Sequence, residues 1–63
     1  GRNSDKEFSR FLSIVLGSIT EVKSQLYVAK DLSYIEEDQF DNLYRQADEV
    51  AKLTHGFRSY LNG

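Results

Sequence analysis

Two stretches of the chain decide its fold: residues 8–29 read FSRFLSIVLGSITEVKSQLYVA, and residues 40–61 read FDNLYRQADEVAKLTHGFRSYL. In each stretch one set of residues recurs at alternating steps of four and three, which is the spacing of a single stripe along an α-helix. The first stripe is Phe8, Leu12, Val15, Ile19, Val22, Leu26 and Ala29, and the second is Phe40, Leu43, Ala47, Val50, Thr54, Phe57 and Leu61. The pattern predicts an all-α fold of two amphipathic helices.

The residues before each stripe indicate where the helices begin. Ser4 and Glu7 have the spacing of a capping box, in which each side chain accepts a hydrogen bond from the other residue's backbone N–H. The first helix is therefore expected over about residues 5–32. An acidic run from Glu36 onward complements the dipole at the start of a second helix, expected over about residues 36–61.

Ser33 lies in the break between the helices, and two roles are open for it. It stands where a glycine would most easily end the first helix, and it also has capping-box spacing to Glu36. Either role leaves a connection of about three to five residues, so the two helices are expected to be antiparallel neighbours. Residues 1–63 then form a single helical hairpin.

The apolar surface is wider than a hairpin can bury. Apolar flanks widen both stripes, and the chain has four Phe and four Tyr among only 63 residues. A chain this short rarely buries enough apolar area alone, and the absence of Cys excludes disulfides and argues against zinc. We therefore expect a homo-oligomer, a dimer of hairpins or a ring, that completes a four-helix bundle by self-association. Its core would contain Phe8, Leu12, Val15, Ile19, Val22, Leu26, Leu43, Val50 and Phe57.

Gly17 lies in the middle of the first helix, where glycine costs about 1 kcal/mol relative to alanine. The favoured interpretation is that another backbone approaches closely at this point. A tolerated, neutral position is the alternative.

No residue pattern of catalytic weight is present. Asp48, Lys52 and His55 share one helix face, but pairing of neighbouring charges on a solvated face explains them better than general base catalysis does. Phosphate-binding glycine loops and diiron motifs are also missing from the sequence. We expect a protein that is not an enzyme and has no catalytic residues, cofactor or metal.

Charge is distributed unevenly along the expected hairpin. Its open end carries Arg2, Lys6, Arg10, Lys52 and Arg58, and its loop end carries Asp31, Glu36, Glu37, Asp38 and Asp41. The basic end is a candidate docking site for a phosphate backbone or an acidic partner. Helix-dipole complementation with local pairing is the favoured alternative, and a third possibility is that basic ends of one protomer meet acidic ends of another.

Further sequence features bear on the location of the protein and on its partners. The sequence has no apolar run near the ~18 residues of a membrane span and no signal-peptide core, so we expect a cytoplasmic protein without a membrane partner. The net charge of −2 argues against a strongly basic nucleic-acid binder.

Several short motifs carry a family resemblance. The opening GRNSDKEFSRFL (1–12) is followed by LGSITE (16–21), QL (25–26) and AKDLSYI (29–35). Together they resemble the bacterial four-helix-bundle proteins encoded in intervening sequences of large-subunit ribosomal RNA genes, closely over residues 1–44 and more loosely afterwards. The family usually has Gly at the position of Ser33. It also carries two further helices before the GRNS motif, so the chain looks like the C-terminal half of a family member.

The resemblance implies an architecture more than an activity. Family members resemble up-and-down bundles that associate into rings, often pentamers. A related branch, the accessory protein of diversity-generating retroelements, resembles a basic barrel that binds a reverse transcriptase and nucleic acid. The resulting expectation is a non-enzymatic oligomeric scaffold. The alternative is a nucleic-acid-binding adaptor, for RNA or a nucleic-acid enzyme, that acts through Arg2, Lys6, Arg10, Lys52 and Arg58.

Overall fold

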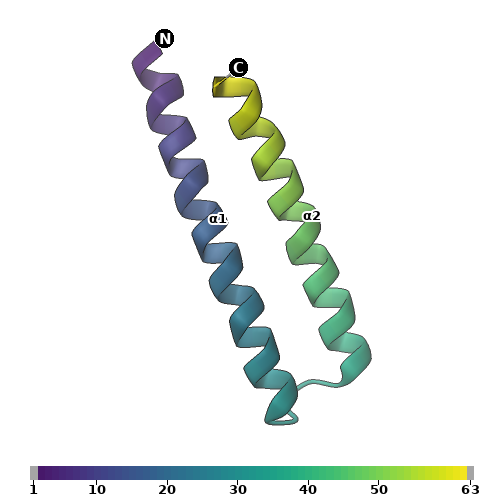
Figure 1. Ribbon diagram of the computed structural model, residues 1–63. Coiled ribbons are helices and arrows are strands. Elements are labelled where there is room, and N and C mark those ends of the chain that lie inside the picture. The colour runs from purple at the N-terminus through teal and green to yellow at the C-terminus, as the bar shows by residue number, and fades with distance from the viewer. Residues whose placement is uncertain (1, 63) are drawn as a thin grey trace.

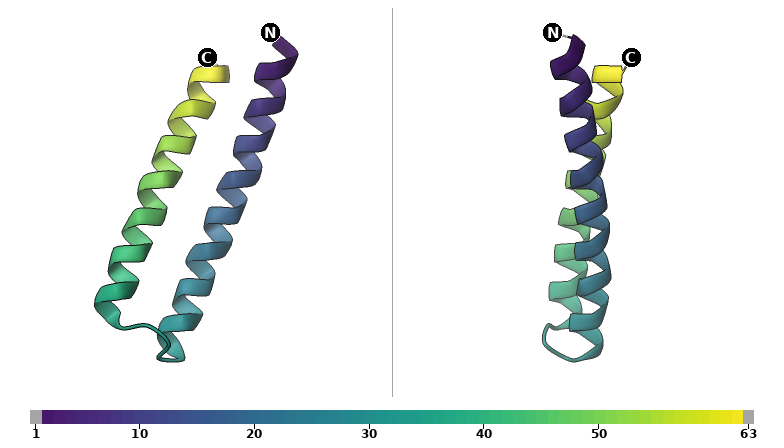
Figure 2. Two further views of the ribbon diagram at one scale, coloured as in Figure 1. Left: turned by 180° about the vertical axis from the view of Figure 1, so that it is seen from behind. Right: turned by 90° about the vertical axis from the view of Figure 1, so that its left-hand side faces the viewer.

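The computed structural model describes residues 2–62, with side chains for residues 4–62, and consists of two antiparallel helices (Figure 1). Helix α1 spans Arg2–Asp31 and helix α2 spans Glu37–Asn62. The predicted helical hairpin is confirmed. Figure 2 shows both termini at one end, here called the open end, and the connection at the other, the loop end. Neither described helix is long and apolar enough to cross a membrane.

Helix α1 begins three residues earlier than the sequence predicts. The helix runs back through Ser4 to Arg2, so Ser4 has a helical backbone and is not the N-cap. The expected capping box of Ser4 with Glu7 is therefore wrong. Acidic side chains such as Asp5 favour the first turn wherever it begins, and no proline sets a boundary here.

The end of α1 settles the role of Ser33. Ser33 has a φ of 61°, in the left-handed region. The N–H of Tyr34 donates to the Ala29 carbonyl at 2.8 Å, and the N–H of Ser33 donates to the Lys30 carbonyl at 3.0 Å. These two bonds form a Schellman motif with Ser33 in the position that glycine usually occupies. The helix-ending role is thus confirmed, and the capping box of Ser33 with Glu36 is wrong.

Glu36 is instead the N-cap of α2. Its carbonyl accepts the first intrahelical bond, from the N–H of Phe40, at 2.9 Å. Its own N–H donates to the side-chain oxygen of Gln39 at 2.8 Å, which is one half of a capping box. Ile35 and Phe40 occupy the two positions of a hydrophobic staple, which fixes how the chain enters the helix. The connection between the helices covers residues 32–36, within the expected length.

The contact between the helices is rotated relative to the predicted stripes. Leu12, Phe40 and Thr54 are the described residues that become buried, at 8%, 6% and 7% exposure. The half-buried positions around them include stripe residues of both helices, such as Ile19, Leu26 and Ala47. They also include a row on one flank of each stripe: Ser9, Leu16, Lys23 and Lys30 on α1, and Tyr44, Ala51 and Arg58 on α2. The opposite flank is left outside the contact. Of the predicted core residues, Phe8, Val22, Leu43, Val50 and Phe57 are exposed in the hairpin.

Side-chain size explains this rotation. Small residues such as Ser9 and Ala51 let the two helix axes approach, and the long stems of Lys23, Lys30 and Arg58 can cover the seam with methylene groups. The larger apolar side chains stay on the other side of the hairpin. The molecule therefore has two unlike faces. The polar face carries Ser9, Lys23, Lys30, Tyr44, Asp48 and Arg58, and the apolar face carries Phe8, Phe11, Val15, Val22, Leu43, Val50, Leu53 and Phe57.

Gly17 lies on the outer side of α1, away from α2. A Cβ built at this position meets nothing within 4 Å. Within the described hairpin no backbone packs against Gly17, so the predicted close approach is not formed there.

Candidate assembly surface

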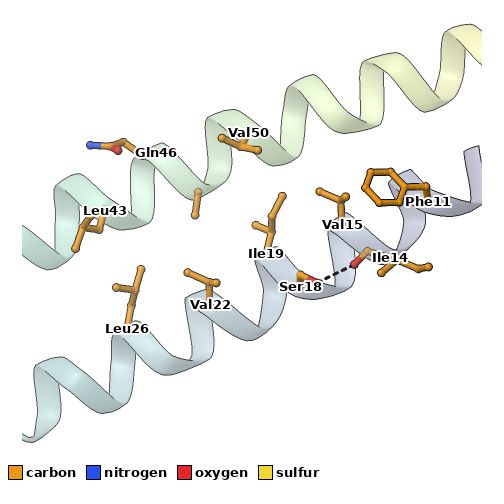
Figure 3. A pocket seen from close by; sticks show the side chains of 11 residues that line it. Phe11, Ile14, Val15, Ser18, Ile19, Val22, Leu26, Leu43, Gln46 and Val50 are labelled. Carbon is orange, nitrogen blue, oxygen red and sulfur yellow. Dashed lines mark hydrogen bonds between the residues drawn. The ribbon is translucent and has the colours of Figure 1, made fainter. Parts of the chain in front are cut away.

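The apolar face has a groove between the two helices (Figure 3). Its volume is about 520 Å³, and its lining is almost wholly apolar. The lining residues are Phe11, Ile14, Val15, Ser18, Ile19, Val22 and Leu26 of α1, and Leu43, Gln46, Ala47 and Val50 of α2. As Figure 3 shows, side chains of both helices extend toward the space between them, so the groove is a joint surface of the hairpin.

Residue pairs on the apolar face show how the two helices are aligned along the axis of the hairpin. The rings of Phe8 and Phe57 lie across the apolar face from each other, with centroids 6.4 Å apart. Seven residues further along each helix, Val15 and Val50 line the same groove. Residues at these paired positions are therefore level with each other along the hairpin axis.

Apolar character is concentrated toward the open end of this face. Phe11, Leu53 and Tyr60 are 57%, 68% and 82% exposed. Ile14 and Phe57 are exposed beside them. Toward the loop end the corresponding positions are more often polar, with Gln25, Gln39, Asn42 and Gln46. The exposed apolar side chains of this face therefore lie mainly in its half toward the open end, which we call the open half.

A second hollow of about 460 Å³ lies on α2 within that half. Its lining is Lys52, Leu53, Gly56, Phe57 and Tyr60. Four of these residues have the spacing i, i+3, i+4 and i+7, which is the outline of a hole in knobs-into-holes packing. A Cβ built on Gly56 meets nothing within 4 Å, so this corner of the hole is not covered by another side chain of the hairpin.

The loop end of the polar face is closed by aromatic rings. The Phe40 ring lies 4.9 Å from the Tyr27 ring and 5.4 Å from the Tyr44 ring, centroid to centroid. The Lys30 ammonium sits 4.3 Å from the Phe40 centroid, a cation–π distance. These contacts hold the two helices together next to the loop.

An ion pair joins the helices further along the polar face. Lys23 of α1 pairs with Asp48 of α2, and its ammonium lies 4.9 Å from the Tyr44 ring centroid. The hydrogen bond to the Asp48 carboxylate raises the pKa of Lys23 above its ordinary value of 10.5. Asp48 therefore pairs across the hairpin and not with Lys52 or His55 on its own helix. The sequence analysis did not predict this pair. The available signal was that Lys23 shares one flank of the first helix with Leu16 and Lys30, seven residues away on either side.

Of the five basic residues predicted to bind nucleic acid, the structure describes four side chains, and these lie at different places on the hairpin. The side chain of Arg2 lies outside the described residues. Lys6 and Arg10 are exposed on α1, toward the polar side. Arg58 is half-buried and lines a polar hollow of about 450 Å³ with His55, Ser59 and Asn62. Lys52 lies elsewhere, at the edge of the hole around Gly56.

A polar contact also closes the open end. The Ser9 hydroxyl donates to the side-chain oxygen of Asn62 at 3.1 Å, which joins the first turns of α1 to the last turn of α2. The polar face is thus tied at its open end, at its middle by the ion pair of Lys23 with Asp48, and at its loop end by aromatic rings. The apolar face has no comparable closure among the described side chains beyond Phe8 and Phe57.

Comparison with known proteins gives one finding. The family model of the 23S rRNA-intervening sequence protein matches residues 1–56, which is most of the chain. Searches of curated proteins and of solved structures returned no match. Because the family match covers all of α1, the loop and most of α2, the chain belongs to the 23S rRNA-intervening sequence protein family.

Proposed function

We propose that this chain is a non-enzymatic assembly module: a helical hairpin that completes a helical bundle by packing its apolar face on other copies. The observation that carries the proposal is the continuous apolar face with its open groove. Monomeric proteins rarely expose apolar patches beyond a few hundred Å² unless the patch binds something. The family description, 23S rRNA-intervening sequence protein, names no reaction. The resemblance implies a bacterial source, and the sequence leads us to place this scaffold in the cytoplasm.

The energetics favour association over an isolated hairpin. Only three described residues are buried, whereas Phe11, Ile14, Leu53 and Phe57 are each more than half exposed. Fully burying a side chain of this size contributes about 1.5–3 kcal/mol. A few such burials equal the entire stability of an ordinary small domain, about 5–15 kcal/mol. Covering the apolar face is therefore the largest stabilising contribution still open to the chain.

Sedimentation equilibrium tests this function directly. We expect the chain to sediment as a dimer or larger assembly at concentrations between about 1 and 100 µM, a range that resolves micromolar association. Leu53→Glu should shift the distribution toward monomer, because it places a charge in the covered surface. Ser24→Glu, on the outer side of α1, is the matched control and should leave it unchanged. A chain that stays monomeric and fully helical across the range contradicts the proposal.

A second function, a nucleic-acid adaptor, has one supporting observation. Lys6, Arg10 and Arg58 lie toward the polar face or the outer side of the hairpin, so they stay accessible when the apolar face is covered. Binding to labelled RNA at several salt concentrations tests it, since phosphate contacts weaken steeply as salt rises. Arg10→Glu should reduce binding. Absence of binding at low salt contradicts this function and leaves the assembly module unaffected.

A further inference from the structure

We infer that the polar hollow formed by His55, Arg58, Ser59 and Asn62, toward the end of α2, binds a phosphate group. The hollow is separate from the groove of the apolar face, so this site goes beyond the assembly function. It also deepens the adaptor function, on which it rests only for the source of the phosphate. The site gives that function one defined contact point on the hairpin.

The four lining residues lie together on one side of α2. Their spacing is i, i+3, i+4 and i+7, which brings side chains of successive turns next to one another. The hollow has a volume of about 450 Å³ and a mainly polar lining. None of the four lining side chains is a carboxylate. The hollow therefore presents groups that can donate hydrogen bonds and no fixed negative charge of its own.

Arg58 is the cation of the hollow, and its stem is restrained by packing. The side chain is half-buried, so the guanidinium has less freedom to lose when it binds a ligand. Within the described part of the chain, the ion pair is that of Lys23 with Asp48, and no carboxylate there pairs with Arg58. The guanidinium fork matches two oxygens of a phosphate at once, which makes arginine well suited to this group.

The amide of Asn62 is oriented by a contact with the other helix. Its side-chain oxygen accepts a hydrogen bond from the Ser9 hydroxyl at 3.1 Å. Because that oxygen is already engaged, the NH2 group is the part of the amide left for a ligand, and this group can only donate. The contact between the helices thus makes Asn62 a donor at the hollow.

Ser59 and His55 add two further donors. The hydroxyls of Ser13 and Ser18 donate to backbone carbonyls four residues earlier, whereas no such bond is formed by Ser59 among the described residues. The Ser59 hydroxyl is therefore available to a ligand. The imidazole of His55 has at least one ring N–H whether it is neutral or charged. Each of the four lining residues can donate to a phosphate oxygen.

The local charge also favours an anion. The last carbonyls of α2 carry the negative end of its dipole, but the positive end of the α1 dipole lies at the same end of the antiparallel hairpin (Figure 2). Lys6 is one turn from Ser9 on the same side of α1, and Asp5 nearby offsets its charge. The positive charge of Arg58 then remains for a ligand.

Titration of the ¹⁵N-labelled chain with inorganic phosphate, followed by NMR, tests the site. Chloride at equal ionic strength is the reference, because it matches the general screening of charges. We expect saturable shifts of the signals of His55, Arg58, Ser59 and Asn62, and none in the loop half of the hairpin. A response that does not saturate, or that chloride reproduces, overturns the proposal.

Asn62→Asp tests the orientation of the amide. It keeps an oxygen for Ser9, and it replaces the NH2 group by an oxygen whose charge repels phosphate. Asn42→Asp makes the same charge change near the start of α2, where the Asn42 oxygen accepts from Arg45. We expect Asn62→Asp to raise the phosphate dissociation constant about tenfold or more, the scale of exchanging a hydrogen bond for a repulsion, and Asn42→Asp to leave it unchanged. Equal effects of the two variants overturn the site.

Arg58→Gln and Arg45→Gln form a second matched pair. Both remove one positive charge, and only Arg58 lines the hollow. Arg58→Gln should weaken phosphate binding by at least as much as Asn62→Asp, while Arg45→Gln should have no effect. Circular dichroism checks that each variant keeps its helix content. Asn62 is exposed, so Asn62→Asp decides the test even where Arg58→Gln loosens the hairpin.

Labelled RNA at low salt shows whether the phosphate belongs to a nucleic acid. RNA binding that Asn62→Asp weakens and Asn42→Asp does not supports both the site and the adaptor function. Phosphate binding without RNA binding supports the site, with free phosphate as its ligand, and contradicts the adaptor function. RNA binding that Asn62→Asp leaves unchanged keeps the adaptor function and overturns the site.

Discussion

Replacing Ser33 by glycine should stabilise the hairpin, because Ser33 holds a φ of 61° in the Schellman motif. The left-handed conformation costs an L-residue about 1–2 kcal/mol, and glycine does not have this cost. Glycine in turn loses about 0.5–1 kcal/mol more conformational entropy on folding. The two hydrogen bonds of the motif are made by backbone atoms of residues 29, 30, 33 and 34, so they survive the change. The net expectation for Ser33→Gly is a gain of about 0.5–1 kcal/mol.

Urea unfolding followed by helical circular dichroism measures this gain. With a slope of about 1 kcal/mol per molar urea, typical of the smallest domains, the midpoint should rise by about 0.5–1 M. All variants are compared at one chain concentration, because association shifts apparent stability by mass action. Ser33→Asn should give part of the gain, since asparagine tolerates this conformation, and Ser33→Ala should give none. A midpoint for Ser33→Gly that equals that of Ser33→Ala would refute the role of backbone strain at this residue.

Three further predictions concern the contacts that hold the hairpin together. Gln39→Ala should destabilise it by about 0.5–1.5 kcal/mol in urea unfolding, because the N–H of Glu36 loses its acceptor. Leu12→Ala should cost about 2 kcal/mol or more, since it removes one of the few buried side chains. The pairing that raises the pKa of Lys23 stabilises the fold fully below pH 10.5, and this contribution is lost as the pH rises through the raised pKa. The difference in urea midpoint between the wild type and Lys23→Gln should therefore shrink from pH 8 to about pH 12.

Much of the architecture follows from heptad spacing alone. The two helices, their antiparallel order and the short connection all match expectation, because apolar periodicity and a sequence without proline leave few alternatives. Ser33 was recognisable as a candidate helix end from its place after the last periodic residues. Its choice between two capping roles needed the backbone conformation, because serine is compatible with both.

The rotation of the helices could not be predicted in the same way. A stripe such as Leu12–Ile19–Leu26 marks the middle of an apolar arc, and either edge of that arc can meet the neighbouring helix. The predicted stripe includes Phe8 and Val22, because that side of the arc is the more apolar one. The hairpin uses the other edge, where Lys23 pairs with Asp48. Of the predicted basic residues, Lys52 and Arg58 line different hollows of α2. Six positions along a helix are not a whole number of turns, so these two side chains leave it on different sides.

This rotation gives the two faces different physical tasks. Hydrogen bonds, ion pairs and cation–π contacts are directional, so contacts such as Ser9 with Asn62 and Lys23 with Asp48 fix the relative height of the helices. Apolar burial is non-directional and scales with area, so it supplies free energy without fixing register by itself. Contacts on the polar face fix the register of the two helices. The apolar side chains therefore lie at defined positions along the hairpin axis. A contact within the chain that uses the less apolar edge therefore leaves the more apolar edge available for association.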